Sequence, residues 1–121
     1  MGLKSYKDLI GYQKGYNLSL QIYKVTKDYP YDERFGLISQ MRRSAVSIAC
    51  NIAEGYGRKN VKEYVQFLYV AYGSCCELET LISLSRDLGL LDSENYSKVY
   101  ELQEEVSKIL NGLIKSLTQN K

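Results

Sequence analysis

Apolar and polar positions follow a helical period along nearly the whole chain. Ser5 and Asp8 resemble a capping box at the start of the first periodic segment. The apolar residues behind this pair recur at steps of three and four and define one face of a helix: Leu9, Tyr12, Tyr16, Leu20 and Tyr23. The helix should end before Tyr29, because a residue that precedes proline avoids the α region. The pattern predicts a first helix over about 5–28.

A second periodic segment predicts a helix over about 33–55. Asp32 is a plausible N-cap, since a short polar side chain can accept a hydrogen bond from a free amide of the first turn. The expected buried stripe consists of Leu37, Met41, Ala45, Ile48 and Ile52. Three alanines spaced four apart would let a neighbouring backbone approach closely: Ala45, Ala49 and Ala53. The sequence Gly55-Tyr56-Gly57 should close the helix with a glycine in the left-handed region.

The third segment, over about 61–88, carries more apolar surface than one helix of a bundle needs. Asn60 is the expected N-cap, with Glu63 as the returning half of a capping box. A nearly unbroken heptad runs through Tyr64, Leu68, Ala71, Cys75, Leu78, Ile82 and Ser85. A second stripe follows Val65, Tyr69, Tyr72 and Cys76. Because a monomeric bundle buries one stripe per helix, the second stripe predicts an oligomer interface.

The fourth segment, over about 93–118, begins after Asp92 or Ser93 as cap. Its apolar stripe is Val99, Leu102, Val106, Ile109, Leu113 and Leu117. Four helices joined by short turns favour antiparallel neighbours. We therefore expect an all-α, up-down-up-down antiparallel four-helix bundle that forms a single domain over residues 1–121.

Composition excludes several familiar kinds of active site. The 121 residues contain no His, so a Ser-His-Asp triad, a His-activated cysteine and nearly all zinc sites are excluded. The three cysteines are odd in number and two are adjacent, which favours reduced thiols. No signal peptide or membrane-spanning run stands out. We expect a cytoplasmic protein without membrane partner, metal or cofactor.

Charge is distributed unevenly between the two halves of the chain. Residues 1–62 carry eleven Lys or Arg and five acidic residues, a net charge of +6, whereas residues 63–121 carry five and nine, a net charge of −4. The first half could attract an anionic partner. The same asymmetry could equally match the basic face of one subunit to the acidic face of another.

Two sets of polar residues are candidate sites. A polar ridge on the second helix contains Gln40, Arg43, Ser47, Asn51 and Glu54. The ridge could bind a polar ligand, or it could set the register between helices or subunits, with Glu77 as a candidate partner for Arg43. A basic set, with tyrosines interleaved, contains Arg42, Arg43, Arg58, Lys59 and Lys62. It could hold a nucleic-acid backbone through phosphate contacts, or it could simply be solvated.

Two motifs of the second helix carry a resemblance to a known family. Arg42-Arg43-Ser44, continuing to Ser47-Ile48, and then Asn51 to Gly55 (Asn-Ile-Ala-Glu-Gly) resemble the bacterial four-helix bundle proteins also called 23S rRNA intervening sequence proteins. The resemblance implies a ring, typically a homopentamer. The family is also similar to the accessory variability protein of diversity-generating retroelements, a basic pentameric barrel that binds nucleic acid and a reverse transcriptase. By analogy, the resemblance implies RNA or DNA, and a protein such as a reverse transcriptase, as partners.

These observations lead to two hypotheses for function. The first is a non-enzymatic homo-oligomer that binds RNA or DNA through the basic set. The alternative is a scaffold or protein-interaction ring without a nucleic-acid role. No catalytic residue is expected in either case.

Overall fold

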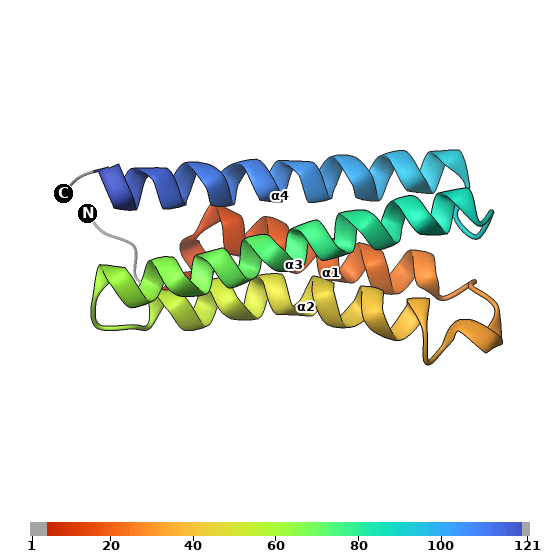
Figure 1. Cartoon of the computed structure of the whole chain (residues 1–121), viewed down its shortest axis with the longest axis horizontal. Helices are drawn as coiled ribbons and strands as arrows, with labels where there is room; N and C mark the ends of the chain where they lie inside the picture. The colour runs from red at the N-terminus through yellow and green to blue at the C-terminus, as the bar shows by residue number, and fades with distance from the viewer. Residues whose placement is uncertain (1–4, 120–121) are drawn as a thin grey trace.

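Four long helices, each antiparallel to the next along the chain, form a bundle in the computed structural model, which describes residues 5–119 (Figure 1). Their bounds are α1 Ile10–Thr26, α2 Leu37–Tyr56, α3 Val61–Asp87 and α4 Ser93–Gln119. Each helix packs against the one before it, and α1 also packs against α4, which closes the bundle. The predicted all-α, up-down-up-down fold is confirmed. Between residues 5 and 119, no helix has both the length and the apolar character that crossing a bilayer requires.

The polar caps expected at Ser5, Asn60 and Asp92 are present, but the first one belongs to a different element. Ser5 and Asp8 form a complete capping box on a short 3-10 helix, η1 (Tyr6–Asp8). Leu9 is extended, with ψ 129°, and separates η1 from α1. The first helix is therefore shorter at both ends than the predicted 5–28. Further along the chain, the carboxylate of Asp92 accepts from the amide of Asn95 at 2.8 Å and caps α4.

The start and the end of α2 differ from the predictions. Asp32 is not its N-cap, because it lies inside a second 3-10 helix, η2 (Tyr31–Glu33), and α2 begins after Gly36. Gly57 does follow the helix, but with φ −80° it stays in the right-handed region. Within residues 5–119, only Gly89, after α3, has a positive φ, of 77°.

The core follows the predicted stripes of α2 and α3. All five apolar residues predicted for α2 are buried, and so is the α3 heptad from Leu68 to Ser85. Tyr64, which starts the heptad, is half-buried. In α4 the buried face is rotated from the prediction: Leu110 and Ile114 are buried, whereas Ile109 and Leu113 are half-buried.

The apolar face predicted for α1 lies largely outside the core. Tyr16 and Leu20 are 53% and 51% exposed, and the buried face of α1 instead carries Gly11 and Gly15 beside larger residues. A Cβ at Gly15 would lie 3.3 Å from Cγ2 of Ile48 and 3.7 Å from the backbone nitrogen of Ala49. The backbones of α1 and α2 therefore approach closely, as the small residues of α2 suggested. This close approach turns the tyrosines of α1 toward solvent.

Candidate nucleic-acid interface

The middle of the polar ridge joins α2 to α3 within one subunit. Ser74 of α3 donates a hydrogen bond of 2.9 Å to the hydroxyl of Ser47. The amide nitrogen of Asn51 donates to the same hydroxyl at 2.9 Å and to the Ser47 carbonyl at 2.8 Å. These bonds satisfy polar groups where two helices meet. The ridge therefore sets a helix register inside the bundle at its centre.

The side chains at the two ends of the ridge differ in their contacts. Gln40 is exposed, and Arg43 donates to the hydroxyl of Ser39 at 3.0 Å. Glu54 forms an ion pair of 3.0 Å with Arg58. The suggested pair between Arg43 and Glu77 is wrong, since the ion pairs among residues 5–119 do not include it. The five ridge residues therefore do not form a single binding site.

The predicted basic set separates into two groups. Arg42 and Arg43 lie near the start of α2, whereas Arg58, Lys59 and Lys62 lie at the turn into α3. The helix axis from Arg43 to the end of α2 at Tyr56 measures about 20 Å at 1.5 Å per residue. The two groups therefore lie toward opposite ends of the bundle.

Arg42 contacts the last turns of α1. Its Nε donates to the hydroxyl of Thr26 at 3.0 Å, and its Nη2 donates to the carbonyl oxygen of Tyr23 at 3.4 Å. The guanidinium carbon lies 4.4 Å from the centre of the Tyr23 ring. A cation is favourable there because the carbonyl end of a helix carries partial negative charge. These contacts fix Arg42 beside α1.

Three arginines line one open groove, which we call the arginine groove. Its hollow measures about 460 Å³ and is lined by Tyr23, Arg34, Ile38, Ser39, Arg42, Arg43 and Val46. Arg34, which the sequence did not single out, lies 3.6 Å over the ring of Tyr31 and 4.5 Å over that of Phe35. Among residues 5–119, none of the three guanidinium groups forms an ion pair with a carboxylate. Their charges remain available to an anion.

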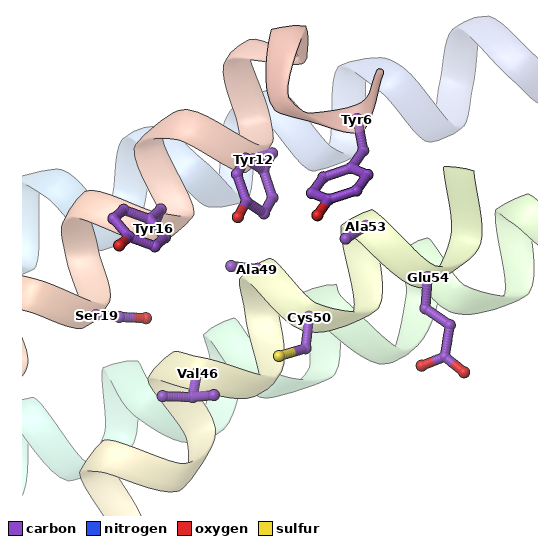
Figure 2. A pocket seen from close by; sticks show the side chains of 9 residues that line it. All are labelled: Tyr6, Tyr12, Tyr16, Ser19, Val46, Ala49, Cys50, Ala53 and Glu54. Carbon is purple, nitrogen blue, oxygen red and sulfur yellow. The ribbon is translucent and has the colours of Figure 1, made fainter. Parts of the chain in front are cut away.

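A second hollow, which we call the tyrosine groove, lies between α1 and α2 (Figure 2). It measures about 570 Å³ and is lined by Tyr6, Tyr12, Tyr16, Ser19, Val46, Ala49, Cys50, Ala53 and Glu54. The ring centres of Tyr12 and Tyr16 are 6.0 Å apart, and those of Tyr6 and Tyr12 are 5.0 Å apart. Burial, together with the neighbouring Tyr6 and Tyr16 hydroxyls, raises the pKa of Tyr12. The groove is therefore aromatic, and Tyr12 adds no negative charge at neutral pH.

The candidate oligomer stripe of α3 divides between the core and the surface. Val65 is buried inside the subunit, so it is unavailable to a partner. Tyr72 is half-buried and packs against the core, whereas Tyr69 and Cys76 are exposed. Tyr69 is 57% exposed and borders two hollows that α4 also lines. Of the predicted stripe, Tyr69 and Cys76 offer the exposed side chains.

The cysteines lie in different environments. Cys75 belongs to the core, and its burial raises the pKa of its thiol from 9.0 to about 11. Its thiolate, the reactive form, is therefore scarce at neutral pH. Cys50, in the tyrosine groove, and Cys76 are exposed thiols.

Comparisons with known proteins place the chain in a family. No curated protein matches the chain significantly. Its fold is similar to the one seen in the crystal structure of a protein with unknown function, from the S23 ribosomal protein family of Bacteroides thetaiotaomicron VPI-5482. That similarity has a TM-score of 0.80 at 23% sequence identity and covers 88% of this chain and 99% of the other. The family model described as 23S rRNA-intervening sequence protein matches residues 7–112. The chain therefore belongs to the 23S rRNA-intervening sequence protein family.

Proposed function

We propose that this protein is a non-enzymatic homo-oligomer that binds nucleic acid through the arginine groove and the adjoining surface of α2. The observation that carries the proposal is the convergence of Arg34, Arg42 and Arg43 on one groove without a carboxylate partner within residues 5–119. A guanidinium matches the geometry of a phosphate better than an ammonium does, because it donates two parallel hydrogen bonds.

The charge distribution supports an anionic partner on this side of the bundle. The +6 of residues 1–62 belongs to the part of the chain that contains α1 and α2, and the −4 of residues 63–121 to the part that contains most of α3 and all of α4. A field of this kind attracts an anionic backbone toward α1 and α2. The name of the family, 23S rRNA-intervening sequence protein, also associates its members with an rRNA sequence.

Assembly into a ring fits the surface that remains exposed. On α3 and at its C-cap Leu88, apolar side chains stay open to solvent: Val61, Tyr69, Val70, Leu84 and Leu88. Opposite net charges on the two sides of the bundle favour contacts between unlike surfaces of neighbouring copies. Contacts between unlike surfaces close into rings when the rotation permits. The ring expected from the family resemblance is a homopentamer.

The experiment is a salt titration of fluorescence anisotropy with a labelled RNA and a labelled DNA. Neutralising three phosphates gives a slope of log affinity against log salt of about −2 for a single strand and about −3 for a duplex. The two single variants, Arg34→Glu and Arg43→Glu, should each weaken binding and make this slope less steep. Lys98→Glu, an exposed charge reversal on α4, is the matched control and should change binding little.

Two results would contradict the proposal. One is the absence of binding at low salt, and the other is an affinity that does not change with salt or with either arginine variant. The variants Arg58→Glu and Lys59→Glu report on the group at the turn into α3, about 20 Å away along α2. A loss at both ends would extend the surface along the whole helix.

A scaffold or protein-interaction ring is the second candidate function. The exposed apolar side chains of α3, with Tyr69 at 57% exposure, favour it, because exposed apolar patches commonly mark protein contacts. Tyr69→Lys should reduce assembly in sedimentation under either function, so the affinity of the wild type for nucleic acid separates the two. A scaffold should show no such affinity.

A further inference from the structure

The tyrosine groove and the arginine groove are neighbours along α1 and α2, and we call the two together the channel. Val46 lines both hollows, so they meet at that residue. The channel follows α2 from Arg42 to Glu54, which is about 18 Å of helix axis. A stacked strand that rises about 3.4 Å per nucleotide spans this length with about five nucleotides. The channel is therefore long enough for a short run of nucleotides.

Two exposed aromatic rings line the α1 side of this channel, and Arg42 covers one face of the Tyr23 ring, which leaves the other face for a base. Tyr16 lines the tyrosine groove and is 53% exposed, and Tyr23 lines the arginine groove and is 46% exposed. They are seven positions apart in the sequence, so they lie on nearly the same face of α1 and about 10 Å apart along its axis. That spacing equals about three stacking intervals of 3.4 Å. Two stacked bases would fit between the two positions.

The α2 side of the channel carries mostly small, uncharged side chains and therefore repels an anion little. Ala49, Cys50 and Ala53 form its surface in the tyrosine groove. Glu54 is the one acidic residue of that lining, and its carboxylate is paired with Arg58 at 3.0 Å. In Figure 2 the Glu54 side chain points away from the three tyrosines.

We propose that single-stranded nucleic acid lies along this channel, with its phosphates at Arg34, Arg42 and Arg43 and its unpaired bases on Tyr16 and Tyr23. The inference rests on the proposed function and adds to it the strandedness of the ligand and its path. The bases of a duplex are stacked on one another and cannot reach a tyrosine ring. Unpaired bases stack on exposed aromatic rings with little regard to sequence.

The test compares a labelled 12-nucleotide single strand with the duplex of the same sequence, by anisotropy at fixed salt. The wild type should bind the single strand more tightly. Tyr16→Ser should weaken single-strand binding about 5- to 100-fold, the range that loss of one stacking ring gives. Tyr16→Phe keeps the ring and removes only the hydroxyl, so it should bind like the wild type. Each variant is also run in sedimentation, to record its assembly.

A cysteine footprint gives a second, independent measurement. Cys50 lies in the channel, whereas Cys76 is exposed on α3 and Cys75 is buried. In a Cys76→Ser variant, bound single strand should slow alkylation of Cys50 at least several-fold. In the matched Cys50→Ser variant, the same strand should leave the alkylation rate of Cys76 unchanged.

The outcomes separate this inference from the function on which it rests. If the protein binds neither form, the proposed function is wrong and the inference falls with it. If it binds the duplex equally well, or if Tyr16→Ser and the Cys50 footprint show no effect, nucleic-acid binding stands and the channel is wrong. If Tyr16→Ser instead dissociates the oligomer, the groove is a subunit contact, which also overturns the inference.

Discussion

Gly55 of α2 meets Phe67 of α3 so closely that a Cβ on Gly55 would lie 2.7 Å from the Cβ of Phe67. The same added atom would lie 3.2 Å from the carbonyl oxygen of Tyr64. Real Cβ atoms do not approach other atoms this closely, because packed interiors resist compression. Glycine at this position therefore permits the contact between α2 and α3 just before their connecting turn.

We expect Gly55→Ala to destabilise the fold by about 1–3 kcal/mol, the usual cost of overpacking. The measurement is urea unfolding followed by circular dichroism. Gly73→Ala is the matched control, since nothing lies within 4 Å of a Cβ at Gly73 in the middle of α3. It should leave stability unchanged or raise it by about 0.4–1 kcal/mol. Equal effects at both glycines would contradict the close contact.

Cys75 should make stability depend on pH above 9. Burial raises the pKa of its thiol to about 11, whereas the unfolded chain has the ordinary value of 9.0. Below pH 9 both states are protonated and the stability from this group is complete. Between about pH 9 and 11 the unfolded state loses the proton first, so stability falls as pH rises, by about 2–3 kcal/mol in total.

The measurement is urea unfolding under reducing conditions at several pH values, for the wild type and Cys75→Ala. The difference between the two curves isolates the thiol, because the tyrosines that also titrate in this range are common to both. The wild type should lose its advantage as pH rises. Parallel curves would show that the thiol titrates alike in both states.

Val65 and Tyr69 should respond in opposite ways to substitution, although both belong to the stripe predicted as an interface. Val65→Ala should destabilise the fold by about 2 kcal/mol, since Val65 is buried inside the subunit. Tyr69→Lys should leave the stability of the subunit within about 0.5 kcal/mol and reduce assembly. Unfolding curves and sedimentation velocity measure the two effects. Normal assembly of Tyr69→Lys would remove α3 from the interface.

Thr26→Val should make the Arg42 side chain more mobile and lower the stability of the fold only slightly. The Thr26 hydroxyl accepts from Nε of Arg42 at 3.0 Å and donates to the Ile22 carbonyl at 2.7 Å. Valine keeps the shape and removes both bonds, at a cost of about 1 kcal/mol. Relaxation of the arginine ¹⁵Nε nuclei reports the mobility directly.

The control for this prediction is Thr118→Val in α4. Thr118 makes the same bond to a carbonyl four residues earlier, that of Ile114, at 2.9 Å. No arginine bonds to its hydroxyl among residues 5–119, so Arg42 should keep its order in this variant. An unchanged Arg42 signal in Thr26→Val would show that the ring and the carbonyl oxygen of Tyr23 are enough to hold the side chain.

The sequence predicted the fold well where side chains decide the packing. The stripes of α2 and α3 are correct because large aliphatic residues at helical spacing have no better place than the core. The first helix is present, but its predicted buried face was largely wrong, because tyrosines resemble core residues in such a pattern whereas Gly11 and Gly15 contribute no side chain to it. The close approach of the α1 and α2 backbones buries the face of α1 that carries the glycines. Hydrophobic periodicity cannot detect this, because glycine has no side chain.

The candidate site was predicted less completely, for a related reason. Arg42 and Arg43 were found because they belong to one helix with a regular period. Arg34 was missed because it joins them through η2 and the end of α1, which spacing along the chain does not relate. Arg58, Lys59 and Lys62 were grouped with Arg42 and Arg43 because closeness in sequence was taken for closeness in space, and the length of α2 separates the two groups.

The contacts of Arg42 with Thr26 and the Tyr23 ring have a thermodynamic consequence. Ordering a free, rotamer-rich side chain at an interface costs about 0.5–1.5 kcal/mol. A phosphate that arrives at Arg42 meets a side chain whose conformational entropy was already given up when the bundle folded. At Lys59 and Lys62 the phosphate must impose that order itself. Preorganisation therefore favours phosphate binding at Arg42 in the arginine groove over binding at Lys59 and Lys62, although all three side chains carry the same formal charge.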